Sequence, residues 1–370
     1  MSRFIPFGSG LAKHSSCTSV GCQKQPLGLV RRRRRIALDP AATLGLTISS
    51  NRQRMAYKSG VIVAVSLLFL FQGCAGRGAH WAARQSVPQA PAAQTRTLAV
   101  YEPWFGHPRH ISVGYSSQDP VTIARQISQA QGMGISGFVV DWYGDREPFV
   151  DRAYSLMQSI AAQKHFQVAM MYDETQEDNG HVTEDTLAAF DKFHDTYLSA
   201  DAPGRQAYLT YNGRPVIFIF PKSRRTDWSR VRAEIDRWDP APLLIDEFPP
   251  PANADPFDGF YAWINPGKAG WAHDGSNWGE DYLRNFYIRM QTKYPEKIEV
   301  GTAWPGFDDS KASWSLGRYM SQRCGQTFAD TIALSQQYSS PEHPLAFLLI
   351  ATWNDYEEGS AIERGLAKCK

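Results

Sequence analysis

The segment 348–365, LLIATWNDYEEGSAIERG, joins an apolar, strand-like run to a group of polar side chains that follows it at once. The run ends near Trp353, and four carboxylates come after it, at Asp355, Glu357, Glu358 and Glu363. Acidic side chains at the end of a buried strand are typical of barrels whose strand ends form an active site. The segment therefore predicts the last strand of such a barrel.

Runs of apolar, β-branched or aromatic residues alternate with helix-like stretches from residue 97 onward. The strands are expected at 97–103, 136–143, 167–173, 215–221, 242–247, 258–264, 298–304 and 345–353, and the helices at 121–133, 147–164, 183–199, 227–238, 280–294 and 326–338. This order predicts a single (β/α)8 TIM barrel over residues 97–370, with a doubly wound open sheet as the alternative. The first strand is followed by VYEPWFGHP rather than a GxGxxG phosphate loop, which favours the barrel.

The expected strand ends carry carboxylates together with large aromatic side chains. Flat rings pack on the C–H faces of sugars, and carboxylates accept hydrogen bonds from sugar hydroxyls, so these residues are predicted substrate contacts. For any single acid the alternative is a helix N-cap. The predicted contacts are Tyr101, Glu102, Trp104, His107, Asp141, Trp142, Tyr143, Asp173, Glu174, Asp246, Glu247, Trp263, Trp304, Trp353, Asn354, Tyr356 and Glu363.

Asp355 and Glu358 are the predicted catalytic pair. Residues three apart lie on one side of a helical turn, so both carboxyls would face the same way and Glu357 would face elsewhere. Glycoside hydrolysis needs two carboxyl groups beside the scissile bond, and crowding raises the pKa of one of them. We predict Glu358 as the general acid and Asp355 as the second carboxylate. A charged helix start without a catalytic role is the alternative.

The same residues resemble those of glycoside hydrolase families 99 and 71. The family 99 pattern is close to N-E-W-H-E-G-T-Q-I-E, which Glu358-Gly359-Ser360 and Ile362-Glu363 follow. The family 71 pattern is W-N-D-Y-G-E, which residues 353–356 follow. Upstream, VYEPWFGHP at 100–108 resembles Y-Y-P-W-Y-G-N-P, and DWYG at 141–144 fits as well.

This resemblance spans residues 97–367 and implies a barrel that acts on α-linked mannan-like or glucan-like polysaccharide without metal or cofactor. It makes Glu358 the general acid/base. Asp355 stands where family 99 has a Glu that deprotonates the 2-hydroxyl of the sugar, and the shorter Asp also suits a base that activates water. Glu357 replaces the family 99 His. The pair His107 and His110 could bind zinc, but no third ligand is evident, so a sugar contact or a loop hydrogen bond is favoured.

The first 96 residues are expected to lie outside the barrel. Residues 55–73 have a short basic start and an apolar run of eleven residues at 61–71, too short for a membrane span and suited to an export signal. They resemble a bacterial lipoprotein signal, which makes Cys74 the lipidation site and 74–96 a flexible tether. The product is then exported and anchored to a membrane, with an intact short anchor as the alternative. Residues 1–54 are expected to be a non-native or disordered leader.

Charge and cysteine content restrict the remaining possibilities. From Cys74 onward the chain has 28 Lys and Arg against 36 Asp and Glu, which argues against a nucleic-acid partner. The run RRRRR at 31–35 could be a nucleic-acid or nuclear signal, but an export signal follows it. Cys324 and Cys369 could pair or stay free.

Three tryptophans, Trp271, Trp278 and Trp314, fall in expected loops, where they could line subsites or cover the barrel. The sequence thus predicts an exported glycoside hydrolase. The alternatives are a glycan-binding lipoprotein and a surface-polysaccharide assembly enzyme on the same fold.

Overall fold

The structure is a computed structural model that describes residues 95–175 and 180–367. The predicted leader at 1–54, the signal at 55–73, the lipidation site Cys74 and most of the tether lie outside the described residues, as does Cys369. No helix among the described residues has the length and apolar character needed to cross a membrane.

Within the described residues, eight parallel strands form the centre of the fold. They are β1 (Arg96–Tyr101), β2 (Gly137–Trp142), β3 (Gln167–Asp173), β5 (Arg214–Phe220), β6 (Leu243–Glu247), β7 (Gly259–Tyr261), β8 (Ile298–Ala303) and β11 (Phe347–Ile350). Each pairs with its neighbours in chain order. The pairings β3–β5 and β1–β11 close the sheet into a barrel.

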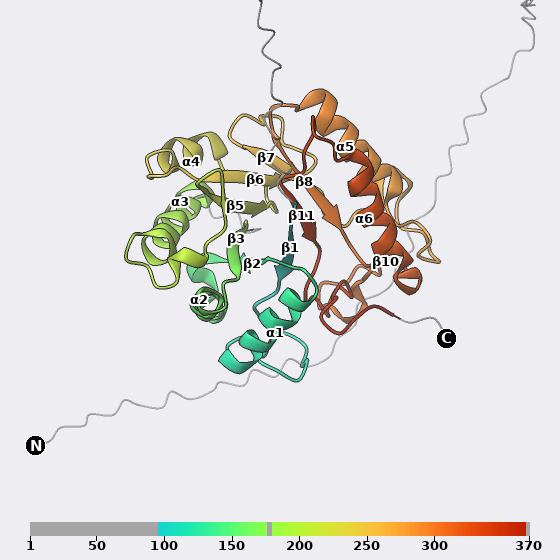
Figure 1. The fold of residues 1–370 in the computed structure, drawn as a ribbon, viewed down its shortest axis with the longest axis horizontal. Helices are drawn as coiled ribbons and strands as arrows, with labels where there is room; N and C mark the ends of the chain where they lie inside the picture. Colours follow the sequence, from blue (N-terminus) through green and yellow to red (C-terminus); the bar gives the residue numbers. More distant parts are fainter. Residues whose placement is uncertain (1–94, 176–179, 368–370) are drawn as a thin grey trace, which may run out of the picture. The chain divides into compact units, whose positions relative to one another are not determined.

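Helices lie outside the barrel and link its strands (Figure 1). They are α1 (Pro120–Gly132), α2 (Pro148–Gln163), α3 (Val182–Phe193), α4 (Trp228–Ile235), α5 (Glu280–Lys293) and α6 (Gln326–Tyr338). α1 begins where Asp119 accepts hydrogen bonds from the N–H groups of Val121 and Thr122, with Pro120 at the first helical position. The β6–β7 connection, which is rich in proline, carries no α-helix.

The connections contain short strands and single helical turns. β4 (Thr210–Tyr211) pairs antiparallel with β5, and β9 (Phe307–Asp308) with β10 (Tyr319–Met320). The single turns are η1 (Gly144–Arg146), η2 (His194–Leu198, a π-turn), η3 (Arg205–Ala207), η4 (Gly267–Ala269), η5 (Asp309–Lys311) and η6 (Arg323–Gly325). The β9–β10 hairpin lies in the long β8–α6 connection, which also contributes residues to the cavity at the barrel end.

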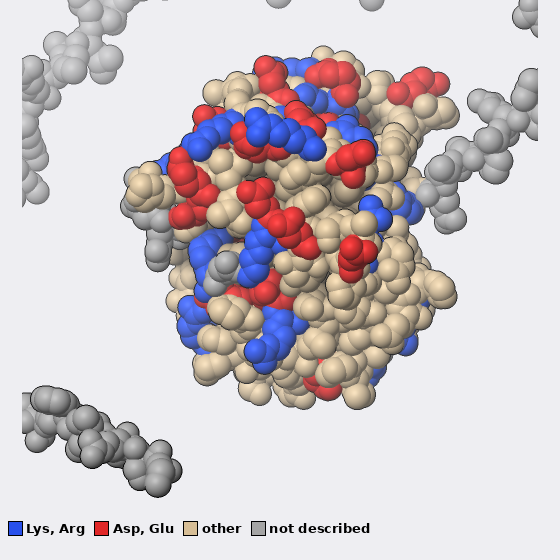
Figure 2. Space-filling view, turned by 90° about the vertical axis from the view of Figure 1, so that its left-hand side faces the viewer, with Lys and Arg blue, Asp and Glu red and all other residues tan. Residues whose placement is uncertain are grey.

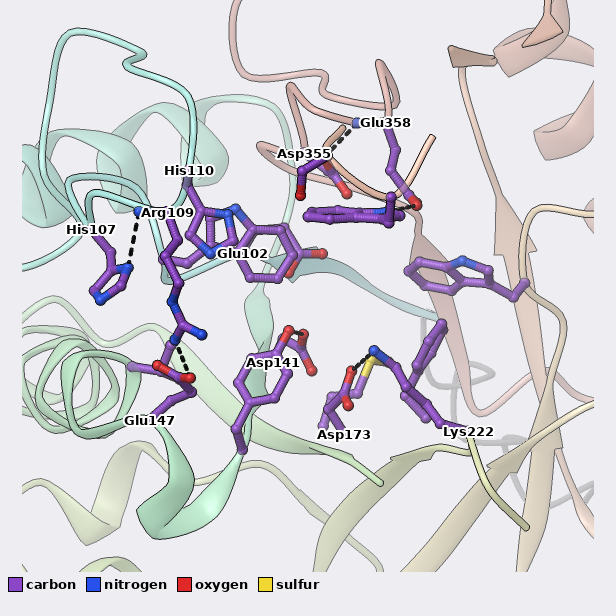
Figure 3. Close-up of a pocket in the computed structure, with 18 of the residues that line it drawn as sticks. Glu102, His107, Arg109, His110, Asp141, Glu147, Asp173, Lys222, Asp355 and Glu358 are labelled. Atoms are coloured by element: carbon purple, nitrogen blue, oxygen red, sulfur yellow. Dashed lines mark hydrogen bonds and ion pairs between the residues drawn. The ribbon is translucent and has the colours of Figure 1, made fainter. Parts of the chain in front are cut away.

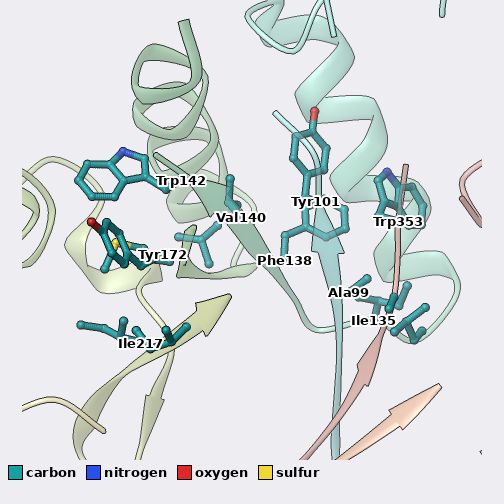
Figure 4. Packing of buried hydrophobic residues seen from close by; sticks show 14 of the residues in the cluster. Ala99, Tyr101, Ile135, Phe138, Val140, Trp142, Tyr172, Ile217 and Trp353 are labelled. Carbon is teal, nitrogen blue, oxygen red and sulfur yellow. The ribbon is translucent and has the colours of Figure 1, made fainter. Parts of the chain in front are cut away.

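Alternate residues of each strand face two separate apolar layers. In β1, Leu98 and Val100 belong to the cluster inside the barrel, whereas Ala99 and Tyr101 belong to the cluster between barrel and helices. Figure 4 shows part of the outer layer, with Tyr101 and other large rings packed beside the strands and helices. The inner layer fills the barrel with aliphatic side chains and the rings of Phe218, Tyr261 and Phe347. The inward register of each strand leads up to one open end.

The eight predicted strands and six predicted helices are all present, with ends that shift by a few residues. The (β/α)8 barrel is therefore confirmed, and the open sheet is excluded by the β3–β5 pairing. β4 and the β9–β10 hairpin are too short to have a periodic sequence signal and were not predicted.

Candidate functional site

A cavity of about 700 Å3 opens at the carboxyl ends of the strands. Figure 3 shows the acidic side chains of Glu102, Asp141, Asp173 and Asp355 around one central space. Among the described residues its walls are formed by Glu102, Trp104, His107, Arg109, His110, Asp141, Tyr143, Glu147, Phe149, Val150, Met171, Asp173, Phe220, Lys222, Trp263, Ile264, Phe307, Ser313, Trp314, Leu316, Arg318, Asp355 and Glu358. This is the end at which barrel enzymes place their active sites.

Strand alternation explains which strand-end residues reach the cavity. Leu98 and Val100 face the barrel interior, so the next residue in that register, Glu102, lies at its mouth. The same count extends from Val139 to Asp141. It also predicts three further lining residues: Asp173 in β3, Lys222 after β5 and Trp263 after β7.

The predicted catalytic pair lies on a hydrogen-bonded turn after β11 rather than on a helix. Oδ1 of Asp355 accepts hydrogen bonds from the N–H groups of Glu357 (2.9 Å) and Glu358 (2.8 Å). Gly359 has φ +63°, and a Cβ there would come within about 3.0 Å of Asp308, so glycine is needed for both reasons. The turn brings both carboxyls to the cavity, as predicted, by a different local structure.

Glu358 is held by the β8–α6 connection. Its Oε1 accepts a hydrogen bond from Nε1 of Trp314 at 2.9 Å, and a guanidinium nitrogen of Arg318 lies 3.5 Å away. The backbone is tied as well, because the N–H of Asp308 donates to the carbonyl of Glu358 at 2.7 Å. The side chain remains 17% exposed, so it is accessible from the cavity.

Four more carboxyls line the cavity, and three of them, Glu102, Asp141 and Asp173, lie with one ammonium group in its centre. Nζ of Lys222 lies 2.8 Å from Oδ2 of Asp173, and the hydroxyl of Tyr143 donates to Oδ2 of Asp141 at 2.6 Å. Oε2 of Glu102 and Oδ1 of Asp141 are buried and have no hydrogen-bond partner among the described residues. Unsatisfied buried oxygens are costly, so both are suited to a ligand that donates hydrogen bonds.

Burial and mutual repulsion raise the pKa values of these acids. Burial raises the pKa of Glu102 well above its usual range, and the charges of Asp141 and Asp355 add to the effect. Burial raises the pKa of Asp141 to about 6 and that of Asp173 to about 8, although Lys222 opposes both shifts.

The two turn acids follow the same rule. Burial and the neighbouring Glu358 raise the pKa of Asp355 well above its usual range, and burial raises that of Glu358, opposed by Trp314 and Arg318. The pair therefore retains a proton at a higher pH than an isolated carboxyl does, as a general acid requires.

Glu357 points away from the cavity, as predicted, and orients a histidine. Its Oε2 lies 2.8 Å from Nδ1 of His110, and its Oε1 accepts a hydrogen bond from the N–H of Ile111. The His110 ring stacks on Trp104 with centroids 4.9 Å apart and 13° between the planes. His107 also lines the cavity. The loop after β1 thus presents flat rings at the cavity wall.

Four predicted contacts lie in the core instead, which corrects the prediction. Tyr101, Trp142, Trp304 and Trp353 are fully buried between barrel and helices. Tyr101 and Trp142 occupy the outward register of their strands. Tyr101 bonds to Gln126, Trp142 to Asp151 and Trp304 to the carbonyl of Trp278.

Six other predicted contacts do not line the cavity. Glu174 accepts hydrogen bonds from the 222–226 loop, and Asp246 lines a separate hollow beside Arg224. Glu247 is largely buried at the end of β6. Asn354 bonds to both backbone groups of Glu102, and Tyr356 donates to Glu363.

The sequence reasoning missed several cavity residues. They are Arg109, Glu147, Phe149, Phe220, Lys222, Phe307, Leu316 and Arg318, whereas His110 and Trp314, both candidates from the sequence, do line the cavity. Strand alternation from Val216 and Phe218 would have found Phe220 and Lys222. The loop residues have no such signal, because their positions depend on how the connections after β1, β2 and β8 pack.

No group of three or more His, Cys, Asp or Glu within the described ranges is arranged to hold a metal ion. On the face in Figure 2, acidic and basic side chains of the described residues intermingle, so this face has no basic stripe for a nucleic acid. Cys324 is disulfide-bonded.

Comparison with known proteins shows likeness in structure alone. No family model matches the chain, and no curated protein matches its sequence. Two structures of a GH99 endo-α-mannosidase from Bacteroides thetaiotaomicron, one with bis-tris propane, are 18% identical to this chain with a TM-score of 0.57. Those matches cover 72% of this chain and 86% and 87% of the other chains. A "glycoside hydrolase-like protein" is 13% identical with a TM-score of 0.50, over 73% of this chain and 86% of its own. At these identities the comparisons support the barrel fold.

Proposed function

We propose that this protein is a glycoside hydrolase that cleaves α-linked polysaccharide or glycan of the α-mannan or α-glucan kind. The observation that carries the proposal is the barrel-end cavity of about 700 Å3, where Asp355 and Glu358 of one turn meet four further carboxyls. Two coupled carboxyls in a partly dry cavity are the chemical requirement of glycosidic cleavage. The fold shared with an endo-α-mannosidase supports the substrate class by analogy.

In this mechanism Glu358 is the general acid. Its carboxyl group donates a proton to the glycosidic oxygen while the bond from that oxygen to the anomeric carbon breaks, and the electron pair stays on the oxygen. The indole N–H of Trp314 fixes Oε1. Oε2 is then the oxygen that carries the proton toward the cavity.

Asp355 is the group that accepts a proton. Its Oδ1 is fixed by two backbone N–H groups, which leaves Oδ2 for the reaction. Oδ2 can deprotonate a water that bonds to the anomeric carbon, giving inversion. It can instead deprotonate the 2-hydroxyl of the sugar, whose oxygen then bonds to that carbon and is displaced by water, giving retention. The anomeric configuration of the first product, followed by NMR, separates the two.

The remaining walls suit a carbohydrate. Trp104, Phe220 and Trp263 offer flat apolar surfaces for C–H faces. The unpartnered oxygens of Glu102 and Asp141 can accept hydrogen bonds from sugar hydroxyls.

The test measures reducing ends released from α-mannans, α-1,3-glucans and other α-linked polysaccharides by the purified wild type and by Glu358→Gln. Release that collapses in the variant is the expected result. Tight binding without release would favour a glycan-binding protein. Elongation of an added acceptor from an activated sugar donor would favour an assembly enzyme. Release that survives in the variant would leave a hydrolase with a different acid.

We also propose export and lipid anchoring through Cys74. The support is the apolar run at 61–71 followed by Gly73 and Cys74. Intact mass of the protein made in a bacterial host should show a diacylglycerol-modified N-terminal Cys74, and Cys74→Ser should release the protein from the membrane fraction. A mature product that retains Arg31 would refute this assignment.

A further inference from the structure

The three loop tryptophans have different environments in the structure. Trp271 packs on Phe307 with centroids 5.2 Å apart, and Trp278 lies under the guanidinium of Arg323 at 5.4 Å. Of these three, all within the described residues, Trp314 alone lines the cavity. Trp271 and Trp278 therefore cover the barrel, while Trp314 needs another explanation.

The loop that carries Trp314 is rigidly organised around one buried acid. Asp309 is fully buried and accepts hydrogen bonds from Ser315 Oγ and from the N–H groups of Leu316 and Arg318. Nε of Arg318 adds an ion pair at 2.7 Å. This network holds a large indole and an isobutyl group in water, with Trp314 41% and Leu316 79% exposed. Apolar groups held at a cavity wall in this way are typical of a binding surface.

The position of Trp314 relative to Glu358 indicates which side of the scissile bond this surface would bind. Its Nε1 donates to Glu358 at 2.9 Å, and its ring meets Trp104 edge-on with centroids 6.3 Å apart and 84° between the planes. A general acid protonates the oxygen that leaves, so the group that leaves must lie beside Glu358. The aromatic surface next to the acid therefore belongs to the leaving side of the bond.

We propose that Trp314, together with Leu316, forms the platform for the sugar ring on the leaving-group side of the scissile bond. The ligand is a pyranose that presents its C–H face to the indole. This inference rests on the proposed hydrolase function. It gives Trp314 two separable tasks: its face binds the leaving sugar, and its N–H holds the acid in place.

The experiment compares Trp314→Ala and Trp314→Phe with the wild type on two kinds of probe. The first probes are α-1,3-linked gluco-oligosaccharides and α-linked manno-oligosaccharides, which have a sugar on the leaving side. The second probes are α-glucosyl and α-mannosyl fluoride, whose leaving group has no ring and needs little protonation. Tyr319→Ala is the matched control, since Tyr319 lies in the same connection with equal exposure, 41%, but outside the cavity lining.

Trp314→Ala should lower kcat/KM for the oligosaccharide by about ten- to a hundredfold and for the fluoride by at most about threefold. Trp314→Phe keeps a ring, so its KM for the oligosaccharides should stay close to that of the wild type. It loses the N–H donor that lowers the pKa of Glu358, so the high-pH limit of oligosaccharide hydrolysis, where the acid deprotonates, should move upward. Tyr319→Ala should show neither change.

Equal losses on both probes, or a Phe variant with an unshifted pH profile and full loss of oligosaccharide affinity, would overturn the platform while leaving the hydrolase intact. Absence of turnover of both probes by the wild type would overturn the proposed function and the platform with it. The same measurements therefore distinguish failure of the platform from failure of the proposed hydrolase function.

Discussion

Asp173 and Glu174 are adjacent in sequence at the end of β3, yet the fold gives them opposite roles. Asp173 continues the inward register and meets Lys222 at the cavity, where burial raises its pKa to about 8. Glu174 faces outward. Burial would raise its pKa, but the hydroxyl of Thr226 and three backbone N–H groups lower it overall. In β3 the register thus decides which acid reaches the cavity and which one braces a loop.

The same contrast separates Asp141 from Asp246. Both end strands and both are buried with raised pKa values, to about 6 and about 8. Asp141 lines the large cavity, whereas Asp246 lines a smaller hollow on another part of the barrel end. Burial and an unusual pKa alone therefore do not identify the site, and the shared cavity with Glu358 does.

The largest expected effect tests this division directly. Glu358→Gln should lower kcat on a cleaved polysaccharide by about 10²- to 10⁴-fold, because the amide cannot donate the proton. Asp246→Asn, a buried acid outside that cavity, should change kcat by no more than about threefold. Steady-state release of reducing ends measures both. Comparable losses in the two variants would show that the two hollows form one functional unit.

The next prediction tests whether the charge of Lys222 keeps Asp141 and Asp173 ionised. Lys222→Met removes the cation that opposes the raised pKa values of Asp141 and Asp173, so both pKa values should rise further. At a given pH, fewer carboxylates are then ionised and able to accept hydrogen bonds from sugar hydroxyls. Activity should therefore begin to fall at a higher pH than in the wild type as the pH is lowered. We expect kcat/KM at pH 7 to fall by about tenfold.

The control for this prediction is Lys311→Met, since Lys311 is exposed and outside the cavity lining. Its pH profile should match that of the wild type. An unshifted profile in Lys222→Met would mean that Asp141 and Asp173 do not need to be ionised for substrate binding.

A smaller effect concerns the brace. Glu174→Gln replaces one acceptor oxygen with an NH2 group that faces N–H donors, so the 222–226 loop loses part of its anchor. Global stability should fall by about 1–3 kcal/mol in urea unfolding. Since the loop positions Lys222, KM should rise more than kcat falls. Glu247→Gln is the matched variant at the end of β6, and equal destabilisation there would show that Glu174 has no special bracing role.

The register rule also shows how far the sequence could be interpreted. Apolar runs and helix spacing predicted every barrel strand, because each strand is buried on both faces and therefore reads as a continuous apolar run. The acids and aromatic residues at the strand ends were identified as a group. Four of them fall in the outward register and do not reach the cavity: Tyr101, Trp142, Glu174 and Asp246. Counting inward positions from the barrel interior excludes these four, but Glu247 and Trp304 fall in the inward count and still do not line the cavity.

Loop residues could not be predicted in the same way. The hydrogen bond from Trp314 to Glu358 joins residues 44 positions apart. It depends on the buried Asp309 and on the docking of Asp308 against the turn at Gly359. The pairing of His110 with Glu357 is similar, because two loops from opposite ends of the chain meet. Periodicity within one element contains no information on such contacts.

The smallest effect returns to Asp246. Burial raises its pKa to about 8, so the folded protein holds this proton more tightly than the unfolded chain does. The stability contribution is complete below about pH 4 and is lost as pH rises through about 8. Asp246→Asn carries no titratable proton at this position. The fall in melting temperature between pH 6 and pH 9 should therefore be a few degrees smaller in the variant.

Asp255→Asn gives the reference, because Asp255 is exposed in the connection that follows β6. Its melting temperature should depend on pH as the wild type does. If Asp246→Asn also kept the wild-type dependence, the Arg224 guanidinium, 3.8 Å from Oδ2 of Asp246, would be holding that carboxylate ionised in the fold. Asp246 would then belong with Glu174 as a charged brace, and its contrast with the cavity acids, whose pKa values burial raises, would be sharper than burial alone implies.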